Sequence, residues 1–437
     1  DRQSGRLEIR LWTALCQRST AGVRLTGVPS KKCKTVAATV NFIAPLQLET
    51  LTPRQLIVNL WPVANAQYPD PTALTVALQD LYGASLRTGV DREGALSIAT
   101  CQLQFLSDAV LPKGESILGP ALALLQAITL HPLLSTAGYA APFFTPEQDN
   151  LRHELQSVTD SADNKAVLTA QAQYFQHAPE QAAVLGGTAA TIEAATAENL
   201  AAYWQQMVSQ DEIEIIVTGD VDPAAVLSQV AAWPLAARPA VTTPLQWTGQ
   251  VPAFRQWQTM ENFQQSQYVA LYHLPVTYYG PTYFQYMVTD ALFGGSANSL
   301  LFAAVREQAS LAYYAGTELD AQTGATLLQA GIDPGTAPQV RQIVADTLQR
   351  MQTGQFTAAR LHSVQEELIA NRLGESDRQS DVNSRLILQY RLPAADMRTA
   401  AFVRQVRAVT PAAVQACAQH YVLVVDYLQE GVAQDGE

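Results

Sequence analysis

The spacing of hydrophobic residues switches along the chain between the two-residue period of strands and the helical period of about 3.6 residues. Residues 35–42 have strand-like spacing, and a helix is predicted to begin at Pro71. Asp70 can cap this helix, because an aspartate accepts hydrogen bonds from the first backbone N–H groups. Its apolar stripe consists of Leu74, Leu78 and Leu81. A further helix is predicted to begin at Thr145, with Pro146 in the first helical position.

The order of predicted elements repeats in the two halves of the chain. In the first half, a helix that begins at Thr196 leads to a strand over residues 212–217. In the second half, a helix capped by Thr410 leads to a strand over residues 422–428. This repetition indicates an internal duplication. We therefore predict an α+β fold of two homologous domains, each a mostly antiparallel sheet covered by helices.

A proline-rich stretch divides the chain near its middle. Regular periodicity fades there, and the stretch contains Pro234, Pro239, Pro244 and Pro252. Such a composition is typical of an interdomain linker. The predicted division is an N-terminal domain over residues 1–233, a linker over 234–256 and a C-terminal domain over 257–437.

The composition narrows the class of protein. A chain of 437 residues with 48% hydrophobic residues is long enough for two or more globular domains. Its net charge of -12 disfavours nucleic acid as a partner, because phosphates repel an acidic surface. No apolar run approaches the length of a transmembrane helix, so no membrane span is predicted. The four cysteines are isolated, which fits a reducing compartment, and we expect a cytoplasmic location.

Common catalytic motifs are absent from the sequence. None of the six histidines lies three to five residues from another, so no helix offers the paired ligands of a catalytic zinc site. His362 and Glu366 are one helical turn apart, and a solvated helix face explains this pair better than a metal site does. The serine-hydrolase motif Gly-x-Ser-x-Gly does not occur, and the glycine-serine turn at 294–296 lacks the lysine of a phosphate loop.

Two other groups of residues combine side chains that can act together. Glu147 and Glu154 are seven residues apart on one predicted helix, which places both carboxylates on one face. Arg306 lies late on a predicted helix and Tyr313 on the strand that follows, so a cation and a phenol can meet at one peptide carbonyl. Both residues also have plainer roles, since arginine can satisfy carbonyls at a helix end and tyrosine is common in half-buried sheets.

The run that contains Arg306 and Tyr313 resembles the second domain of the insulinase metallopeptidase family, which includes pitrilysin and the processing peptidases. That domain has a glycine-serine turn, a Leu-Phe pair, an Arg-Glu pair and then a tyrosine, with six residues between the arginine and the tyrosine. Residues 293–314 follow this order. Segments 68–84, 187–203 and 217–221 resemble other parts of the family in the same order. The resemblance implies the processing-peptidase fold, also known as the LuxS-like metallohydrolase fold.

The chain departs from the family at the zinc helix. In the family this helix carries His-x-x-Glu-His, which supplies two zinc ligands and a general base. The corresponding residues here are Gln55, Val58 and Asn59, while Glu154 and Glu147 match the third ligand and its acidic partner. One carboxylate cannot hold a catalytic zinc ion. We therefore predict that this chain binds no metal or other cofactor and cuts no peptide by itself.

The family resemblance also implies a way for such a chain to function. Small subunits of the family pair, one carrying the zinc motif and the other the arginine and tyrosine, and one bacterial branch lacks the zinc motif. We predict a non-catalytic, substrate-binding subunit of a heterodimeric zinc peptidase, with zinc on the partner. Arg306 and Tyr313 would bind the carbonyl of an extended peptide. The alternatives are a homodimeric peptide-binding or scaffold protein without peptidase activity, and an autonomous hydrolase that uses Glu154 with His153 or His362.

Overall fold

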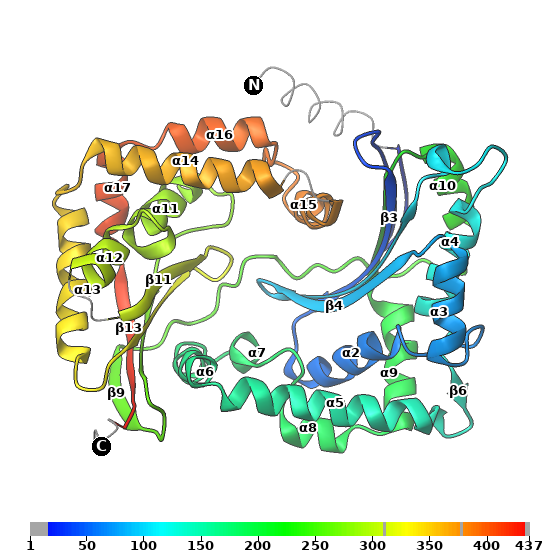
Figure 1. Cartoon of the computed structure of the whole chain (residues 1–437), viewed down its shortest axis with the longest axis horizontal. Helices are drawn as coiled ribbons and strands as arrows, with labels where there is room; N and C mark the ends of the chain where they lie inside the picture. Colours follow the sequence, from blue (N-terminus) through cyan, green and yellow to red (C-terminus); the bar gives the residue numbers. More distant parts are fainter. Residues whose placement is uncertain (1–15, 309–311, 376–378, 433–437) are drawn as a thin grey trace. The chain divides into compact units, whose positions relative to one another are not determined.

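The computed structural model describes residues 16–308, 312–375 and 379–432. The chain forms two compact units (Figure 1). Unit 1 consists of residues 1–155, 184–244 and 378–391, and unit 2 consists of residues 156–183, 245–377 and 392–437. Each unit contains one large sheet and its own hydrophobic core.

Unit 1 contains a six-stranded sheet in the order β1-β2-β8-β3-β5-β4. Its strands are β1 (Cys16–Thr20), β2 (Val23–Pro29), β3 (Thr35–Pro45), β4 (Ser85–Glu93), β5 (Leu96–Leu106) and β8 (Glu212–Gly219). Neighbouring strands are antiparallel, except that β2 and β8 are parallel. Strands β1 and β4 therefore form the two edges of this sheet.

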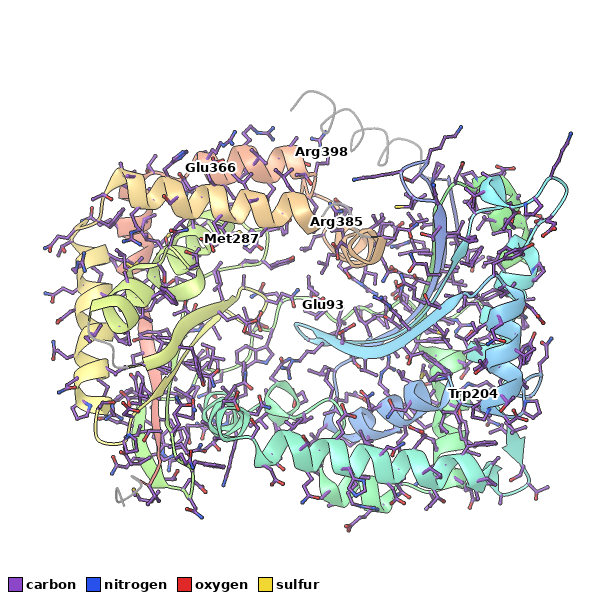
Figure 2. The ribbon with its side chains drawn as sticks, in the orientation of Figure 1. Glu93, Trp204, Met287, Glu366, Arg385 and Arg398 are labelled. Atoms are coloured by element: carbon purple, nitrogen blue, oxygen red, sulfur yellow. The ribbon has the colours of Figure 1, made fainter. Side chains whose placement is uncertain are left out.

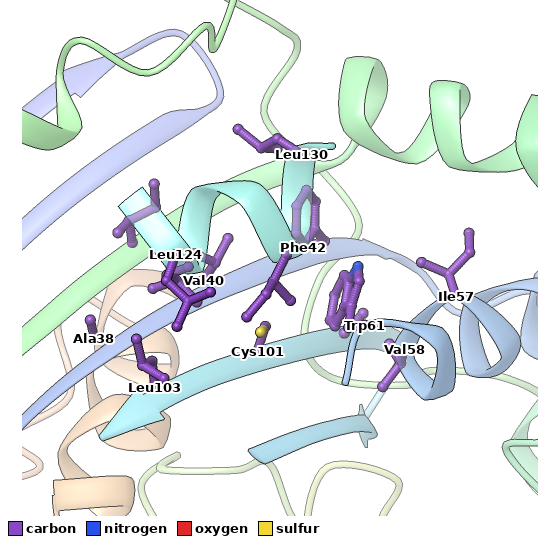
Figure 3. Packing of buried hydrophobic residues seen from close by; sticks show 14 of the residues in the cluster. Ala38, Val40, Phe42, Ile57, Val58, Trp61, Cys101, Leu103, Leu124 and Leu130 are labelled. Atoms are coloured by element: carbon purple, nitrogen blue, oxygen red, sulfur yellow. The ribbon is translucent and has the colours of Figure 1, made fainter. Parts of the chain in front are cut away.

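Most helices of unit 1 cover one face of this sheet. They are α2 (Leu48–Leu60), α3 (Pro71–Asp80), α4 (Leu118–Leu130), α5 (Ala141–Asp160, as far as residue 155), α8 (Ala189–Ala194), α9 (Ala197–Gln210) and α10 (Pro223–Val230). Val40 and Phe42 are alternate residues of β3, and both lie in the core with Leu124 and Leu130 of α4 (Figure 3). Helix α9 begins, as predicted, where Thr196 caps it by accepting a hydrogen bond from Asn199 N.

The opposite face of the unit 1 sheet is covered by α15 (Gln379–Arg391), which comes from the C-terminal part of the chain. Asn41 on β3 donates a hydrogen bond of 3.0 Å to Asn383, and Thr26 on β2 lies 2.6 Å from the hydroxyl of Tyr390. Because α15 supplies these polar partners, β3 is buried on both faces.

Unit 2 contains a five-stranded sheet in the order β11-β12-β10-β13-β9. Its strands are β9 (Arg255–Met260), β10 (Ser266–His273), β11 (Ala312–Asp320), β12 (Ala325–Ile332) and β13 (Val422–Glu430). All neighbours are antiparallel except β9 and β13. Strands β9, β13, β10, β12 and β11 take the same places as β2, β8, β3, β5 and β4 of unit 1. The predicted two-domain α+β architecture is confirmed, and the duplication is visible in the shared strand order.

The sheet of unit 2 is likewise covered on both faces. One face carries a core formed with α11 (Tyr283–Asp290), α13 (Ala337–Gln352), α14 (Ala358–Glu375), α16 (Thr399–Arg407) and α17 (Pro411–Ala418). Two π-helical turns, η2 (Ala291–Gly295) and η3 (Ala303–Gln308), flank the short α12 (Leu300–Phe302). The other face is covered by α6 (Ala162–Tyr174), followed by α7 (Pro179–Ala182). Ala166, Ala170 and Tyr174 of α6 pack there with Val269 and Val425.

The structure divides the chain differently from the predicted boundaries at residues 233 and 257. Segments 156–183 and 378–391 each belong to the unit formed mainly by the other half of the chain. The predicted linker contains the division between the units, which falls after Pro244. The linker residues on each side of this division are hydrogen-bonded to the unit to which they belong. Arg238 N donates to Ala21 O at 2.9 Å, and Trp247 N donates to Gln322 O at 2.8 Å. A helical sequence pattern does not specify which sheet the helix covers, so the exchange was not predicted.

One stretch within the described residues, Tyr283–Val305, is long and apolar enough to cross a membrane by length and composition alone. However, 67% of its most apolar window is buried inside the protein. Such burial is typical of a core helix.

A buried carboxyl group lies where α15 contacts the sheet of unit 1. Glu214 of β8 is 0% exposed, and its Oε1 is 3.3 Å from Nη1 of Arg24. Its Oε2 has no hydrogen-bond partner. Burial raises the pKa of Glu214 to about 8, although Arg24 and Arg391 oppose this shift and Glu212 adds to it. The folded protein therefore binds a proton here that the unfolded chain releases near pH 4.5.

We expect the free energy of unfolding to depend on the proton at Glu214. Because the folded pKa is the higher one, the stabilisation is complete below about pH 4.5 and is lost as the pH rises through about 8. Glu214→Gln removes this dependence, so wild type should lose a few kcal/mol relative to the variant between these pH values. Urea denaturation from pH 5 to 8.5 measures the difference. Exposed Glu193→Gln is the control, and parallel pH profiles for wild type and Glu214→Gln would contradict the prediction.

Candidate functional site

The positions of the expected zinc motif lie on α2, and their side chains satisfy one another without a metal. Gln55 and Asn59 are one helical turn apart, and Gln55 Nε2 donates to Asn59 Oδ1 at 2.8 Å. Val58, at the position of the general base, is 1% exposed and belongs to the core. Figure 3 shows Val58 and Trp61 at the end of α2, next to the strands that carry Phe42 and Cys101.

This donor set does not fit zinc. Catalytic zinc is held by imidazole, thiolate and carboxylate groups, whereas α2 offers two carboxamides and an isopropyl group at the relevant positions. Within the described part of the chain, no group of three or more His, Cys, Asp or Glu residues is arranged to hold a metal ion. No step of a zinc-dependent reaction can therefore be assigned to α2.

The two glutamates of α5 do not complete a metal site. Glu154 is exposed, and Glu147 is half-buried and accepts a hydrogen bond from Asn150 at 3.2 Å. Burial raises the pKa of Glu147, and the bond from Asn150 opposes this shift. Helix α5 begins at Ala141, four residues before the predicted start at Thr145. Gln148 of α5 donates hydrogen bonds to the carbonyls of Ile192 and Ala195.

Helices α2 and α5 nevertheless meet at one turn. Thr52 of α2 donates to the carbonyl of Gly186 at 2.9 Å, and a Cβ on Gly186 would lie 2.9 Å from Cδ1 of Leu151 on α5. Gly187 has a positive φ of 86°, and a Cβ there would lie 2.0 Å from Thr52 Oγ1. The glycine pair therefore allows this close approach. This turn therefore joins α2 and α5, the two helices that carry the expected metal-site positions.

The position of α2 is fixed by a buried ion pair that the sequence did not reveal. Arg54 is 0% exposed, and its Nη1 donates to Oδ2 of Asp211 at 2.5 Å. Its Nη2 donates to the carbonyl of Phe42 on β3 at 2.7 Å. Burial raises the pKa of Asp211, and the guanidinium of Arg54 opposes this shift. An arginine on the buried face of an apolar helix was the only sequence signal of this arrangement.

Arg306 and Tyr313 lie on neighbouring elements of unit 2. Arg306 is in η3, Tyr313 is near the start of β11, and these two elements are in contact. The side chains of Arg306 and Tyr313 are outside the described part of the structure, so their convergence stays a prediction. The adjacent Tyr314 is described, and its hydroxyl donates to Gln267 Oε1 at 2.6 Å.

Comparison with known proteins connects this geometry to a family. Residues 194–368 match the family model described as the Peptidase M16 inactive domain. The chain is also similar to the "Probable inactive metalloprotease YmfF" of Bacillus subtilis (strain 168). The two sequences are 25% identical over 338 residues, and this match covers 76% of this chain and 78% of the relative. Over these stretches the chain is similar to inactive members of the M16 peptidases. This family is the insulinase-like family that the sequence resembles.

Solved structures support the assignment at the level of the fold. A conserved protein from Enterococcus faecalis V583 is 27% identical, with a TM-score of 0.92 over 97% of this chain and 100% of the other. A peptidase M16 inactive domain from Pseudomonas fluorescens is 18% identical, with a TM-score of 0.78 over 97% of this chain and 100% of that one. The likeness to proteins described as inactive, together with the donor set on α2, supports the interpretation of the chain as a pseudoenzyme.

Loss of Arg54 should destabilise unit 1 strongly. Arg54→Met leaves the carboxylate of Asp211 buried without its main partner, which costs about 3–5 kcal/mol of unfolding free energy. The control is Arg152→Met, because the Arg152–Asp149 pair is exposed and contributes about 0–1 kcal/mol. Urea denaturation gives both values. Equal costs for the two variants would show that Arg54 does not hold α2.

Restoring the two histidines should create a zinc site on α2. The 2.8 Å contact shows that side chains at positions 55 and 59 converge, so Gln55→His with Asn59→His places two imidazoles on one face. Zinc should then raise the melting temperature of the double variant by mass action and leave that of wild type unchanged. Gln55→Ala with Asn59→Ala is the control. An equal rise in wild type would contradict our conclusion about the donor set.

Proposed function

We propose that this chain is the non-catalytic, substrate-binding subunit of a heterodimeric zinc peptidase. The proposal is carried by the chemistry of α2. Gln55 and Asn59, which are hydrogen-bonded to each other, and the buried Val58 occupy the positions at which the family resemblance places the zinc ligands and the general base. Such a chain needs a partner that carries His-x-x-Glu-His if it is to take part in peptide cleavage. We expect the pair to act in the cytoplasm.

The edge strand β4 supports a role in peptide binding. In the described structure β4 pairs with β5 alone, so residues 85–91 lie on a sheet edge to which an extended peptide could add as a further strand. A pocket of about 320 Å³ lies beside it, between β4, β5 and α15. It is lined by Gly89 and Asp91 of β4, with Asn383 and Ile387 among its residues from α15. An extended peptide on this edge could place a side chain in the pocket.

Arg306 and Tyr313 are the residues proposed to act in the shared reaction. Arginine and tyrosine are hydrogen-bond donors, so together they can bind the scissile carbonyl and stabilise the charge that develops on its oxygen. The family resemblance is the support for this assignment. The zinc ion that activates water would belong to the partner.

The proposal can be tested with the assembled pair. The chain is purified with its His-x-x-Glu-His partner, and cleavage of a quenched fluorescent peptide is measured. Arg306→Ala and Tyr313→Phe should each lower kcat roughly 10²–10³-fold, as expected for loss of one donor to an oxyanion. The matched controls are exposed Arg350→Ala and the neighbouring Tyr314→Phe, which should change kcat less than about threefold.

The outcomes separate the candidate functions. Unchanged cleavage in Arg306→Ala and Tyr313→Phe would remove these residues from the reaction. A chain that associates only with itself and binds peptide without cleavage would instead be the homodimeric binding protein considered as the alternative.

A further inference from the structure

The sheets of the two units differ at one edge. In unit 1, β1 pairs antiparallel with β2 and adds a sixth strand to the five that the units share. In unit 2, β9 is the counterpart of β2 and lies beside β13 at the edge of its sheet (Figure 1). Within the described residues, no strand pairs with the other side of β9. The duplication therefore leaves the sheet of unit 2 one strand short of the sheet of unit 1.

The segment that precedes β9 does not form the missing strand. In unit 1, β1 comes directly before β2 in the chain, and the two strands form a hairpin. In unit 2, residues 245–254 precede β9 and contain no strand. Pro252 lies close to β9 in this segment and has no N–H group to offer to a strand ladder. A strand in the place of β1 must therefore come from elsewhere.

The side chains of β9 alternate between the two faces of the sheet, and side chains project from both faces in Figure 2. One face of β9 meets α6, because Nη1 of Arg255 donates to Oε1 of Gln173 at 2.6 Å. Trp257 packs on the same face against the cluster that contains Ala166 and Tyr174 of α6. The residues between them form the outer face, where four side chains are exposed: Phe254, Gln256, Gln258 and Met260.

The backbone groups of β9 alternate between β13 and the outer edge of the sheet. Glu261 N donates to Glu430 O of β13 at 2.9 Å, so the N–H group of Thr259, two residues earlier, points to β13 as well. The N–H groups of Gln256 and Gln258 therefore point to the outer edge. These are the groups that an added strand would bind.

Large apolar side chains are exposed at both ends of β9. Phe254 is 56% exposed, and Met260 is 66% exposed, which is the largest exposed fraction among the large hydrophobic residues of the described chain. Edge strands are usually protected from association by charges, prolines or bulges. Strand β9 pairs with β13 without a bulge, and Arg255 is its only charged residue. This edge lacks the usual protection against pairing with another strand.

The sequence of this edge is complementary to itself in the antiparallel direction. Phe254 and Met260 each lie three residues from Trp257, so a two-fold axis at Trp257 places Phe254 of one copy opposite Met260 of the other. The thioether of methionine and an aromatic ring attract each other. The same axis places Arg255 diagonally opposite Glu261, which is also on the face toward α6. Opposite charges in this arrangement stabilise a strand pair.

We propose that two copies of this chain associate through β9, with antiparallel pairing about Trp257 that joins the two unit 2 sheets into one. The second copy thus supplies the strand that β1 supplies in unit 1. The contact goes beyond the proposed function and does not depend on it, because β11 lies at the opposite edge of the sheet. Since β9 has only 6 residues, the interface is small, and we expect a dissociation constant on the order of 10 µM.

Sedimentation velocity of the full-length chain from about 1 to 100 µM tests the association. Wild type should change from mostly monomer to mostly dimer over this range. Gln258→Pro removes an N–H group from the outer edge and should weaken the dimer at least about tenfold. Gln258→Ala is the matched control, because it removes the same side chain but keeps the N–H group, and it should change the affinity less than about threefold.

Met260→Lys provides a second comparison if Gln258→Pro does not fold. A lysine on an edge strand opposes pairing, so this variant should weaken the dimer at least about fivefold. The control is Val76→Lys, which makes the same kind of change at an exposed position of α3 in unit 1 and should leave the affinity unchanged. A wild type that stays monomeric, or a dimer that both lysine variants weaken equally, would overturn the proposal.

Disulfide formation tests the pairing about Trp257. In this register, position 256 of one copy lies opposite position 258 of the other, with Cα atoms about 5.5 Å apart, which a disulfide can span. A mixture of Gln256→Cys chains with Gln258→Cys chains should therefore cross-link on oxidation more than either variant alone. Wild type, which has cysteines of its own, is the control. Cross-linking of the mixture no greater than that of wild type would show that β9 does not pair with itself in this way.

Discussion

The arrangement of unit 1 depends on Arg54, which is fully buried and therefore must be paired. Its guanidinium connects α2 to Asp211 at the start of β8 and to the carbonyl of Phe42 on β3. A buried ion pair gains little net stability, because desolvation offsets the attraction, but its geometry is demanding. The pair thus determines where α2 lies, and with it where Gln55, Val58 and Asn59 lie.

Each unit is completed by a helix from the other half of the sequence, and the two contacts differ in chemistry. Helix α15 meets the sheet of unit 1 through polar partners, such as Asn41 with Asn383, and covers the buried carboxyl of Glu214. Helix α6 meets the sheet of unit 2 mainly through Ala166, Ala170 and Tyr174. The polar contact responds to pH because a buried carboxyl group titrates, whereas the apolar contact depends on area removed from water.

The duplicated architecture also separates two kinds of site. Helix α2 has Gln55 and Asn59 where the family resemblance places zinc ligands, and Val58 belongs to the core. The corresponding place in unit 2 keeps a buried carboxylate, Asp290, beside an open pocket.

The sequence by itself determined the class of fold and the absence of the His-x-x-Glu-His motif. Periodicity and capping residues such as Thr196 are local signals, and the absence of His-x-x-Glu-His is a statement about composition. Only the tertiary structure decided the membership of α6 and α15, the start of α5 and the pairing of Arg54 with Asp211. These features join residues far apart in the chain, and a local pattern contains no information about the partner.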